Sequence, residues 1–78
     1  MEQGTRVDKT LDIKGLAGQR QVAVTESVLQ TIAKGQTLKV VTDNAGTKRT
    51  FPLLCEHLGC TLLSIEEGGG IVSFVIRK

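Results

Sequence analysis

The sequence predicts an α/β domain, more narrowly an α+β two-layer sandwich, in which a four-stranded mixed sheet carries two helices on one face. Three observations predict it. Apolar residues alternate in short segments, they recur at helical spacing in two longer segments, and glycines separate the segments. The resulting order is β-α-β-α-β-β, and with only two helices both should cover the same face. The 78 residues fit a single domain over residues 1–78, with the polar residues 1–6 expected to be flexible.

The first strand is predicted over about residues 7–13, where apolar and polar residues alternate, and Gly15 ends it. Residues 21–34 then form a helix, because apolar side chains recur three and four positions apart at Val24, Val28, Leu29, Ile32 and Ala33. We expect Gly35 to end this helix in the left-handed conformation. Lys34 would then lie in the last turn, where a positive charge is favoured.

The second strand is predicted over residues 38–42, a segment with little polar character that indicates burial. A second helix follows, with an apolar stripe at Phe51, Leu54, Cys55 and Leu58. Pro52 fits only its first turn, where the missing N–H has no intrahelical partner. Thr47 or Thr50 is expected to cap this helix.

Gly59 should end the second helix, and two further strands are predicted over about residues 60–66 and 71–77. Residues 67–70, Glu-Gly-Gly-Gly, are a flexible hairpin connection between them. In the last strand, alternate residues should face the helices. One core is therefore expected from Val28, Leu29, Ile32, Phe51, Leu54, Cys55, Leu58, Phe74 and Ile76.

Composition excludes several classes of protein. No apolar run is long enough for a transmembrane helix, and no signal peptide is apparent at the first residues. Two cysteines five positions apart are no disulfide framework, so a reduced, cytoplasmic protein is expected. The net charge of +2 comes from intermixed acidic and basic residues rather than a basic stripe, which leaves nucleic-acid binding uncertain.

The predicted topology creates one candidate binding edge. If the first two strands are parallel, each leads from its C-terminal end into a helix, and both helix N-termini lie at the same edge of the sheet. Residues 15–21 and 43–50 line this edge and bring Arg20, Lys48 and Arg49 together. Unpaired N–H groups with these cations favour a small anion. The alternative is that they are ordinary solvated charges around two helix starts.

The chain resembles the TusA/SirA family of small sulfur-carrier proteins over nearly its whole length. The matching segments are Leu11-Asp12, Gly15-Leu16, Gly35-Gln36-Thr37-Leu38, Asp43, Phe51-Pro52, Leu58-Gly59 and Ile76-Arg77-Lys78. The resemblance implies sulfur carried as a persulfide on the cysteine of a Cys-Pro-x-Pro motif, and a protein partner in a sulfur-relay or related pathway. Here Gly18 stands at the cysteine, and Gln19 and Gln21 stand at the two prolines. Glycine has no side chain to hold sulfur.

The chain has other side chains of reactive types, among them two cysteines and a histidine. Cys55 lies on the apolar stripe, where a buried thiol is usually inert, whereas Cys60 should be easier to reach. Cys55 and His57 point about 200° apart on a helix, so no metal site is expected, and His57 should be exposed in the last turn. Asp12 is expected to accept backbone N–H groups of residues 15–18. Asp43 is expected in a turn or cap.

The leading hypothesis is a non-thiol, degenerate member of the family, which binds a sulfur-relay partner or a small anion at the helix N-terminal edge. The expected binding residues are Gly18, Gln19, Arg20, Gln21, Asp43, Lys48 and Arg49. One alternative is a sulfur carrier that uses Cys60 as a relocated cysteine, and a second is an RNA-binding module. The residues indicate no autonomous enzyme, cofactor or membrane partner, and any activity should be sulfur transfer.

Overall fold

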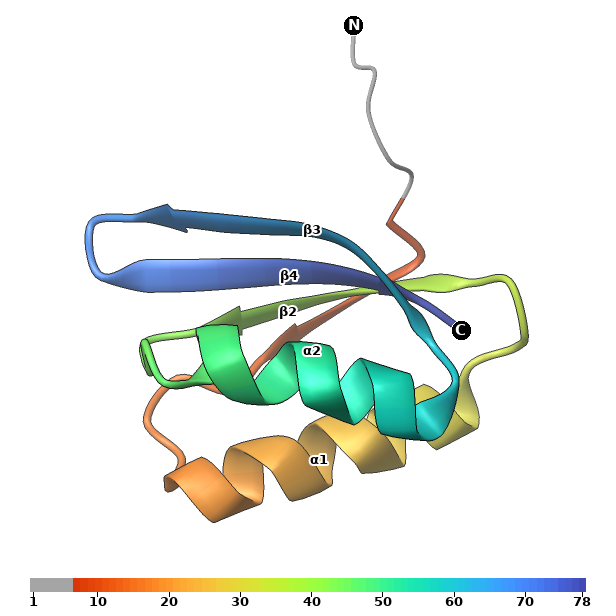
Figure 1. The fold of residues 1–78 in the computed structure, drawn as a ribbon, viewed down its shortest axis with the longest axis horizontal. Coiled ribbons are helices and arrows are strands. Elements are labelled where there is room, and N and C mark those ends of the chain that lie inside the picture. Colours follow the sequence, from red (N-terminus) through yellow and green to blue (C-terminus); the bar gives the residue numbers. More distant parts are fainter. Residues whose placement is uncertain (1–6) are drawn as a thin grey trace, which may run out of the picture.

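The computed structural model describes residues 7–78 and contains the two helices and four strands in the predicted order (Figure 1). The elements are β1 (Lys9–Asp12), α1 (Gly18–Thr31), β2 (Thr37–Thr42), α2 (Thr47–Leu58), β3 (Thr61–Gly68) and β4 (Ile71–Arg77). The expected flexibility of residues 1–6 concerns a segment outside the described residues. Neither helix of the described part has the length and apolar character needed to cross a bilayer.

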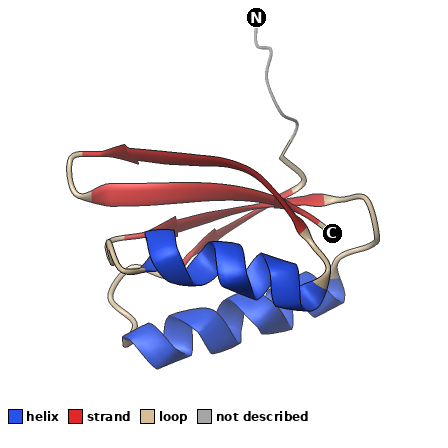
Figure 2. Ribbon diagram, in the orientation of Figure 1, coloured by secondary structure: helices blue, strands red, loops and turns tan. Residues whose placement is uncertain are grey.

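The sheet has the strand order β1-β2-β4-β3. β1 runs parallel to β2, whereas β4 pairs antiparallel with both β2 and β3, so the sheet is mixed as predicted. Both helices lie on one face (Figure 2). Residues 72, 74 and 76 of β4 face these helices and are buried, while the residues between them are partly exposed on the uncovered face. The predicted two-layer sandwich is therefore confirmed.

The core lies between the sheet and the helices and is centred on two aromatic rings. Phe51 of α2 and Phe74 of β4 stack with ring centroids 4.7 Å apart, and both are fully buried. This cluster confirms most of the predicted core, although Val28 and Leu58 are only partly buried against it. The buried members are Ile13, Leu29, Ile32, Leu38, Val40, Phe51, Cys55, Val72, Phe74 and Ile76.

The end of α1 differs from the prediction that Gly35 terminates the helix after Lys34. The helix ends at Thr31, and Ile32 is already extended, with φ −92° and ψ 160°. Gly35 is left-handed, with φ 90°, but it lies in a separate turn that the Gln36 amide closes on the Ala33 carbonyl at 3.0 Å. The physical reason is local capping, since the Gln36 side chain accepts the Ala33 N–H at 2.7 Å and competes with continued helix.

The start of α2 also differs from the prediction. Pro52 is the sixth residue of the helix rather than part of its first turn, and it leaves the carbonyl of Lys48 without an i+4 donor. Lys48 is exposed, so water can solvate that carbonyl. No threonine caps the helix: the hydroxyl of Thr47 donates to the Asn44 carbonyl at 2.6 Å, and that of Thr50 donates to the Gly46 carbonyl at 3.2 Å.

The two predicted glycine features at the end of the chain are confirmed. Gly59 ends α2 in the left-handed conformation, with φ 75°. Gly69 and Gly70 form the hairpin between β3 and β4, with φ 61° and 81°. Positive φ at both central residues is the geometry of a type I′ turn, which matches the twist of the strands that it joins. β3 therefore extends to Gly68, two residues further than predicted.

Candidate functional site

Both helices begin at the same end of the sheet, beside the C-terminal ends of β1 and β2 (Figure 1). Gly18 is the first residue of α1 and is exposed. A Cβ atom built on Gly18 would lie 3.5 Å from the side-chain nitrogen of Asn44, in ordinary van der Waals contact and with no other neighbour within 4 Å. Residues 15–21 and 43–50 therefore meet at one edge, which we call the helix-start edge.

A buried glutamine joins the two segments of this edge. The side chain of Gln21 is 1% exposed, donates to the Leu16 carbonyl at 2.9 Å and accepts from the Thr42 hydroxyl at 2.8 Å. The Thr25 hydroxyl donates to the Gln21 carbonyl at 2.8 Å. Gln21, which sequence reasoning placed among the binding residues, thus holds the loop before α1 against the end of β2. Its own side chain is not at the surface.

Asn44 organises the other segment, and sequence reasoning did not select it. Its backbone amide donates to the Thr42 hydroxyl at 3.0 Å, and its side-chain oxygen accepts the Gly46 amide at 2.9 Å. Asn44 therefore extends the Gln21–Thr42 connection into the turn before α2. The available signal was the turn composition Asp43-Asn44-Ala45-Gly46, in which an asparagine commonly bonds the backbone two residues on.

The two aspartates predicted near this edge are both exposed. Asp12 does accept a loop amide, but the donor is Lys14 at 3.0 Å rather than a residue of 15–18. The carboxylate is satisfied within two residues, which corrects the predicted partner. Asp43 lies in the bend between β2 and α2, in agreement with the predicted turn.

The charges at the helix-start edge favour an anion. Neither helix has an acidic residue in its first turn, and no side chain caps either N-terminus. Arg20 and Arg49 are exposed. Lys48 and Arg49 line a hollow of about 530 Å³ with Ala45 and Gly46. The first amides of α2, those of residues 47–50, already donate to the carbonyls of residues 44–46, so the unpaired amides of this edge are those at the start of α1. These amides, with the arginines nearby, suit a negatively charged group.

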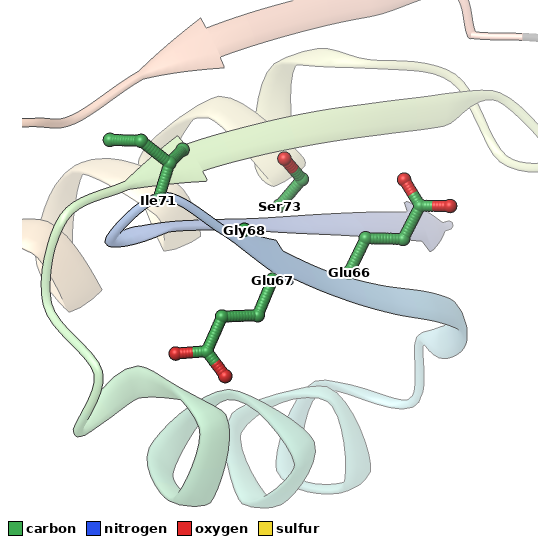
Figure 3. A pocket seen from close by; sticks show the side chains of 5 residues that line it. All are labelled: Glu66, Glu67, Gly68, Ile71 and Ser73. Carbon is green, nitrogen blue, oxygen red and sulfur yellow. The ribbon is translucent and has the colours of Figure 1, made fainter.

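Lys48 is the one cation of this edge with an acidic partner among the described residues. Its ammonium group lies 2.6 Å from Glu67, and Figure 3 shows the Glu67 side chain directed toward α2. Glu66, the preceding residue, points to the other side of β3. These two glutamates, with Gly68, Ile71 and Ser73, line an acidic hollow of about 570 Å³ at the hairpin. That hollow disfavours anions. Because Lys48 is paired with Glu67, Arg20 and Arg49 are the unpaired positive charges of the helix-start edge.

The two cysteines lie at the opposite end of α2. Cys55 is 2% exposed, as predicted, and burial raises the pKa of its thiol from 9.0 to about 11, with a smaller effect from the charge of nearby Cys60. Cys60 is half-buried. His57 is exposed in the last turn of α2, as predicted. Over residues 7–78, no three His, Cys, Asp or Glu side chains gather where they could hold a metal ion.

Comparison with known proteins supports the resemblance seen in the sequence. The sequence profile of a family described as "Sulfurtransferase TusA" matches residues 9–78. A "Sulfur carrier protein TusA" of Pseudomonas entomophila is 35% identical over 71 residues, covering 91% of this chain and 89% of the relative. A protein of the same name from Pseudomonas paraeruginosa is 33% identical over 72 residues, covering 92% of this chain and 91% of the relative.

The fold is also similar to that of a solved structure. The crystal structure of a SirA-like protein from Desulfitobacterium hafniense superposes with a TM-score of 0.70, covering 88% of this chain and 95% of the other. The two sequences are 18% identical, so this likeness concerns the fold. The solved structure therefore has the same fold as the sheet and helices that form the helix-start edge.

Proposed function

Because the chain belongs to the TusA family of sulfur carriers, we propose that it is a non-thiol member, which binds at the helix-start edge instead of carrying sulfur there. By the resemblance described above, Gly18 stands where the family has its cysteine. The ligand is an anion or an anionic group of a protein partner in a sulfur-relay pathway, and the expected environment is the reducing cytoplasm.

One observation carries the proposal. Gly18 lies at the first turn of α1, beside Asn44 of the turn before α2, in a position that a side chain could occupy without a clash. The scaffold around a reactive group is thus present while the group itself is absent. What remains at that point is the start of α1 with its unpaired amides, together with Arg20 and with Arg49 of α2, which can bind an anion but cannot form a persulfide.

Two observations favour this function over the alternatives. Cys60 follows the C-terminus of α2, where the helix dipole disfavours a thiolate. Proteins that bind single-stranded RNA without sequence preference commonly stack its bases on exposed aromatic rings. The two phenylalanines of this chain are both fully buried. Anion binding at the helix-start edge requires neither a relocated thiol nor an aromatic platform.

The test is an NMR titration of the protein with phosphate and sulfate. The amide signals of residues 18–22 and 47–51 should shift more than all others, and the affinity should fall as chloride is added because the site is exposed. Arg20→Gln and Arg49→Gln should each weaken the response. Arg77→Gln, which removes an exposed arginine from β4, is the matched control and should not. Shifts spread evenly over the surface would contradict an anion site at this edge.

A second experiment restores the missing group. Gly18→Cys should have a thiol pKa below the unperturbed value of about 8.5, because a helix N-terminus and nearby cations favour a thiolate. Incubated with a cysteine desulfurase and cysteine, this variant should gain the mass of sulfur, and the parent protein should not. Sulfur gained by the parent and lost in Cys60→Ser would instead establish the relocated carrier.

A further inference from the structure

One face of the sheet is uncovered, because both helices lie on the other face and no further element of residues 7–78 lies over this one (Figure 2). On β4 the uncovered positions are those of Ile71, Ser73, Val75 and Arg77, which alternate with the buried core residues. We call this surface the open sheet face. We propose that it binds the open sheet face of a second copy of this chain, so that the protein forms a weak symmetric dimer.

The charges of the open sheet face are sorted toward two ends. Paired residues of neighbouring strands share a face and form rows across it. The row of Ser73 contains two acidic side chains, Asp12 on β1 and Glu66 on β3. The two cations, Lys39 and Arg77, lie in the following rows toward the C-terminus of β4. One end of the face is therefore acidic and the other is basic.

Two valines lie at the centre of the face. Val41 belongs to the acidic row and Val75 to the row of Lys39, and both are partly exposed. They come from β2 and β4, the two middle strands of the sheet. Association of two copies would remove these side chains from water, which favours binding, while the surrounding charges select the relative orientation of the copies.

Most of these charged groups lack a partner within one copy. Lys39, Glu66 and Arg77 form no ion pair with any other residue of 7–78. Asp12 has an exposed contact of 3.7 Å with Lys14. The contact between Arg77 of one copy and Glu66 of the other should therefore supply most of the charge complementarity.

A third carboxylate of this face is already engaged. Asp8, which precedes β1 at the basic end, accepts the amide of Thr37 at 2.9 Å and its hydroxyl at 3.1 Å. These hydrogen bonds hold Asp8 against the start of β2. The two cations at that end are thus left for a partner.

The acidic end is also hollowed and can receive a long side chain. Figure 3 shows Glu66, Ile71 and Ser73 on the side of the hairpin away from α2, whereas Glu67 points toward α2. Arg77 lies six residues beyond Ile71 on β4, a distance of about 20 Å along an extended strand. The arginine and the hollow of one copy cannot meet each other, but they can meet those of a second copy.

One two-fold arrangement joins these features. Packed sheets keep their strand directions within about 30°. If each strand lies over its own counterpart and runs the opposite way, Arg77 reaches the hollow beside Glu66 of the other copy, and Lys39 lies near Asp12 of the other copy. Each contact then occurs twice. The other two-fold arrangement, with β1 over β3, would place Asp12 over Glu66 and is disfavoured by repulsion.

The dimer should be weak because the face is small. With four strands about 4.8 Å apart and the seven residues of β4 rising about 3.4 Å each, the face spans roughly 20 by 24 Å. This is less than the roughly 800 Å² per partner of a standard interface. We therefore expect a Kd on the order of 0.1–1 mM, increasing with salt because charge pairs contribute.

The first experiment is a dilution series at low salt from about 1 mM to about 0.02 mM, followed by NMR and sedimentation equilibrium. The mean mass should fall toward that of one chain. The amide signals of Asp12, Lys39, Val41, Ser73 and Val75 should shift together. Residues 18–22 and 47–51 of the helix-start edge should not shift on dilution, so failure of this proposal is distinguishable from failure of the proposed function.

The second experiment reverses single charges. Arg77→Glu and Glu66→Arg should each raise the dimer Kd by about tenfold or more, because two attractive contacts become repulsive. An equimolar mixture of these two variants should associate again, because each contact then joins one acidic and one basic group. Lys9→Glu on β1 and Glu56→Arg on α2 make the same charge changes at exposed positions outside the open sheet face and should leave the Kd unchanged.

Several results would overturn the proposal. They are a single-chain mass at about 1 mM, equal association of Arg77→Glu and Lys9→Glu, and no recovery in the mixture. Open-face signals that ignore dilution but shift when residues 1–6 are removed would assign the face to the chain's own N-terminal segment. If Arg77→Glu weakens the fold by circular dichroism, the comparison of Glu66→Arg with Glu56→Arg decides alone.

Discussion

The hydrogen bond between the Thr42 hydroxyl and the Gln21 side chain, 2.8 Å long and buried at both ends, gives the sharpest test of how the helix-start edge is held. In Gln21→Leu the Thr42 hydroxyl loses its acceptor. In Thr42→Val the side-chain oxygen of Gln21 loses its donor. A buried polar group left without a partner costs about 1–3 kcal/mol, so each single variant should lower the free energy of unfolding by at least that amount.

The double variant Gln21→Leu/Thr42→Val removes both partners and should recover part of the loss, because replacing a hydrogen-bonded pair with apolar groups is nearly neutral. The hydrogen bond of Gln21 to Leu16 is lost in both variants that carry Gln21→Leu, and that of Asn44 to Thr42 in both variants that carry Thr42→Val. These losses therefore cancel when the double variant is compared with the sum of the singles. The expected interaction energy is about 1–3 kcal/mol, which is large against a domain's total of about 5–15 kcal/mol.

Urea unfolding followed by far-ultraviolet circular dichroism is the appropriate assay, since the chain has no tryptophan or tyrosine for fluorescence. The matched control combines Thr42→Val with Gln19→Leu, a change at an exposed glutamine of the same helix turn. That pair should be additive within about 0.5 kcal/mol. Additivity of the Gln21 and Thr42 changes within the same margin would refute the role assigned to their hydrogen bond.

Three further outcomes are expected. Phe74→Ala should cost about 3–5 kcal/mol in urea unfolding, because it empties the centre of the core beside Phe51; a loss under about 1 kcal/mol would contradict that packing. Because burial raises the pKa of Cys55 from 9.0 to about 11, the folded state holds this proton more tightly. Stability should therefore fall as pH rises from about 9 to 11, and Cys55→Ala should lose this component of the pH profile. Glu67→Gln should cost about 0.2–1 kcal/mol at low salt through the exposed pair with Lys48 and nothing at high salt, so an effect unchanged by salt would exclude the ion pair as its cause.

The element order and most of the core could be predicted because they depend on the spacing of apolar residues. The buried stripe of α1 could not. The apolar positions suggested a face through Val24 and Val28, yet these are only partly buried, and the face against the sheet runs through Gln21, Thr25 and Leu29. Polar residues can occupy a core when they satisfy one another, and a sequence pattern does not show which partners they will meet.

The helix boundaries were missed for a related reason. Rules for Pro52, Gly35 and the capping threonines assume that each residue acts through its usual local preference. Here the side chain of Gln36 accepts the Ala33 amide in the turn after α1, and Pro52 is tolerated in the second turn of α2, after the exposed residue Lys48. The position of Gly18 at the edge followed from topology alone, whereas the nearness of the Asn44 side chain to the space that a Cβ on Gly18 would occupy required the three-dimensional arrangement of two loops.

The strand order has a consequence for synthesis on the ribosome. β4 lies between β2 and β3, so neither antiparallel strand pairing can form before the strand that is translated last of the four. Until residues 71–77 leave the exit tunnel, β3 has no partner and the inner edge of β2 is open. The nascent chain can pair only β1 with β2, while the apolar face of β2 lacks Phe74. We therefore expect the sheet to be completed only once β4 has left the exit tunnel, with an open strand edge exposed to chaperones until then.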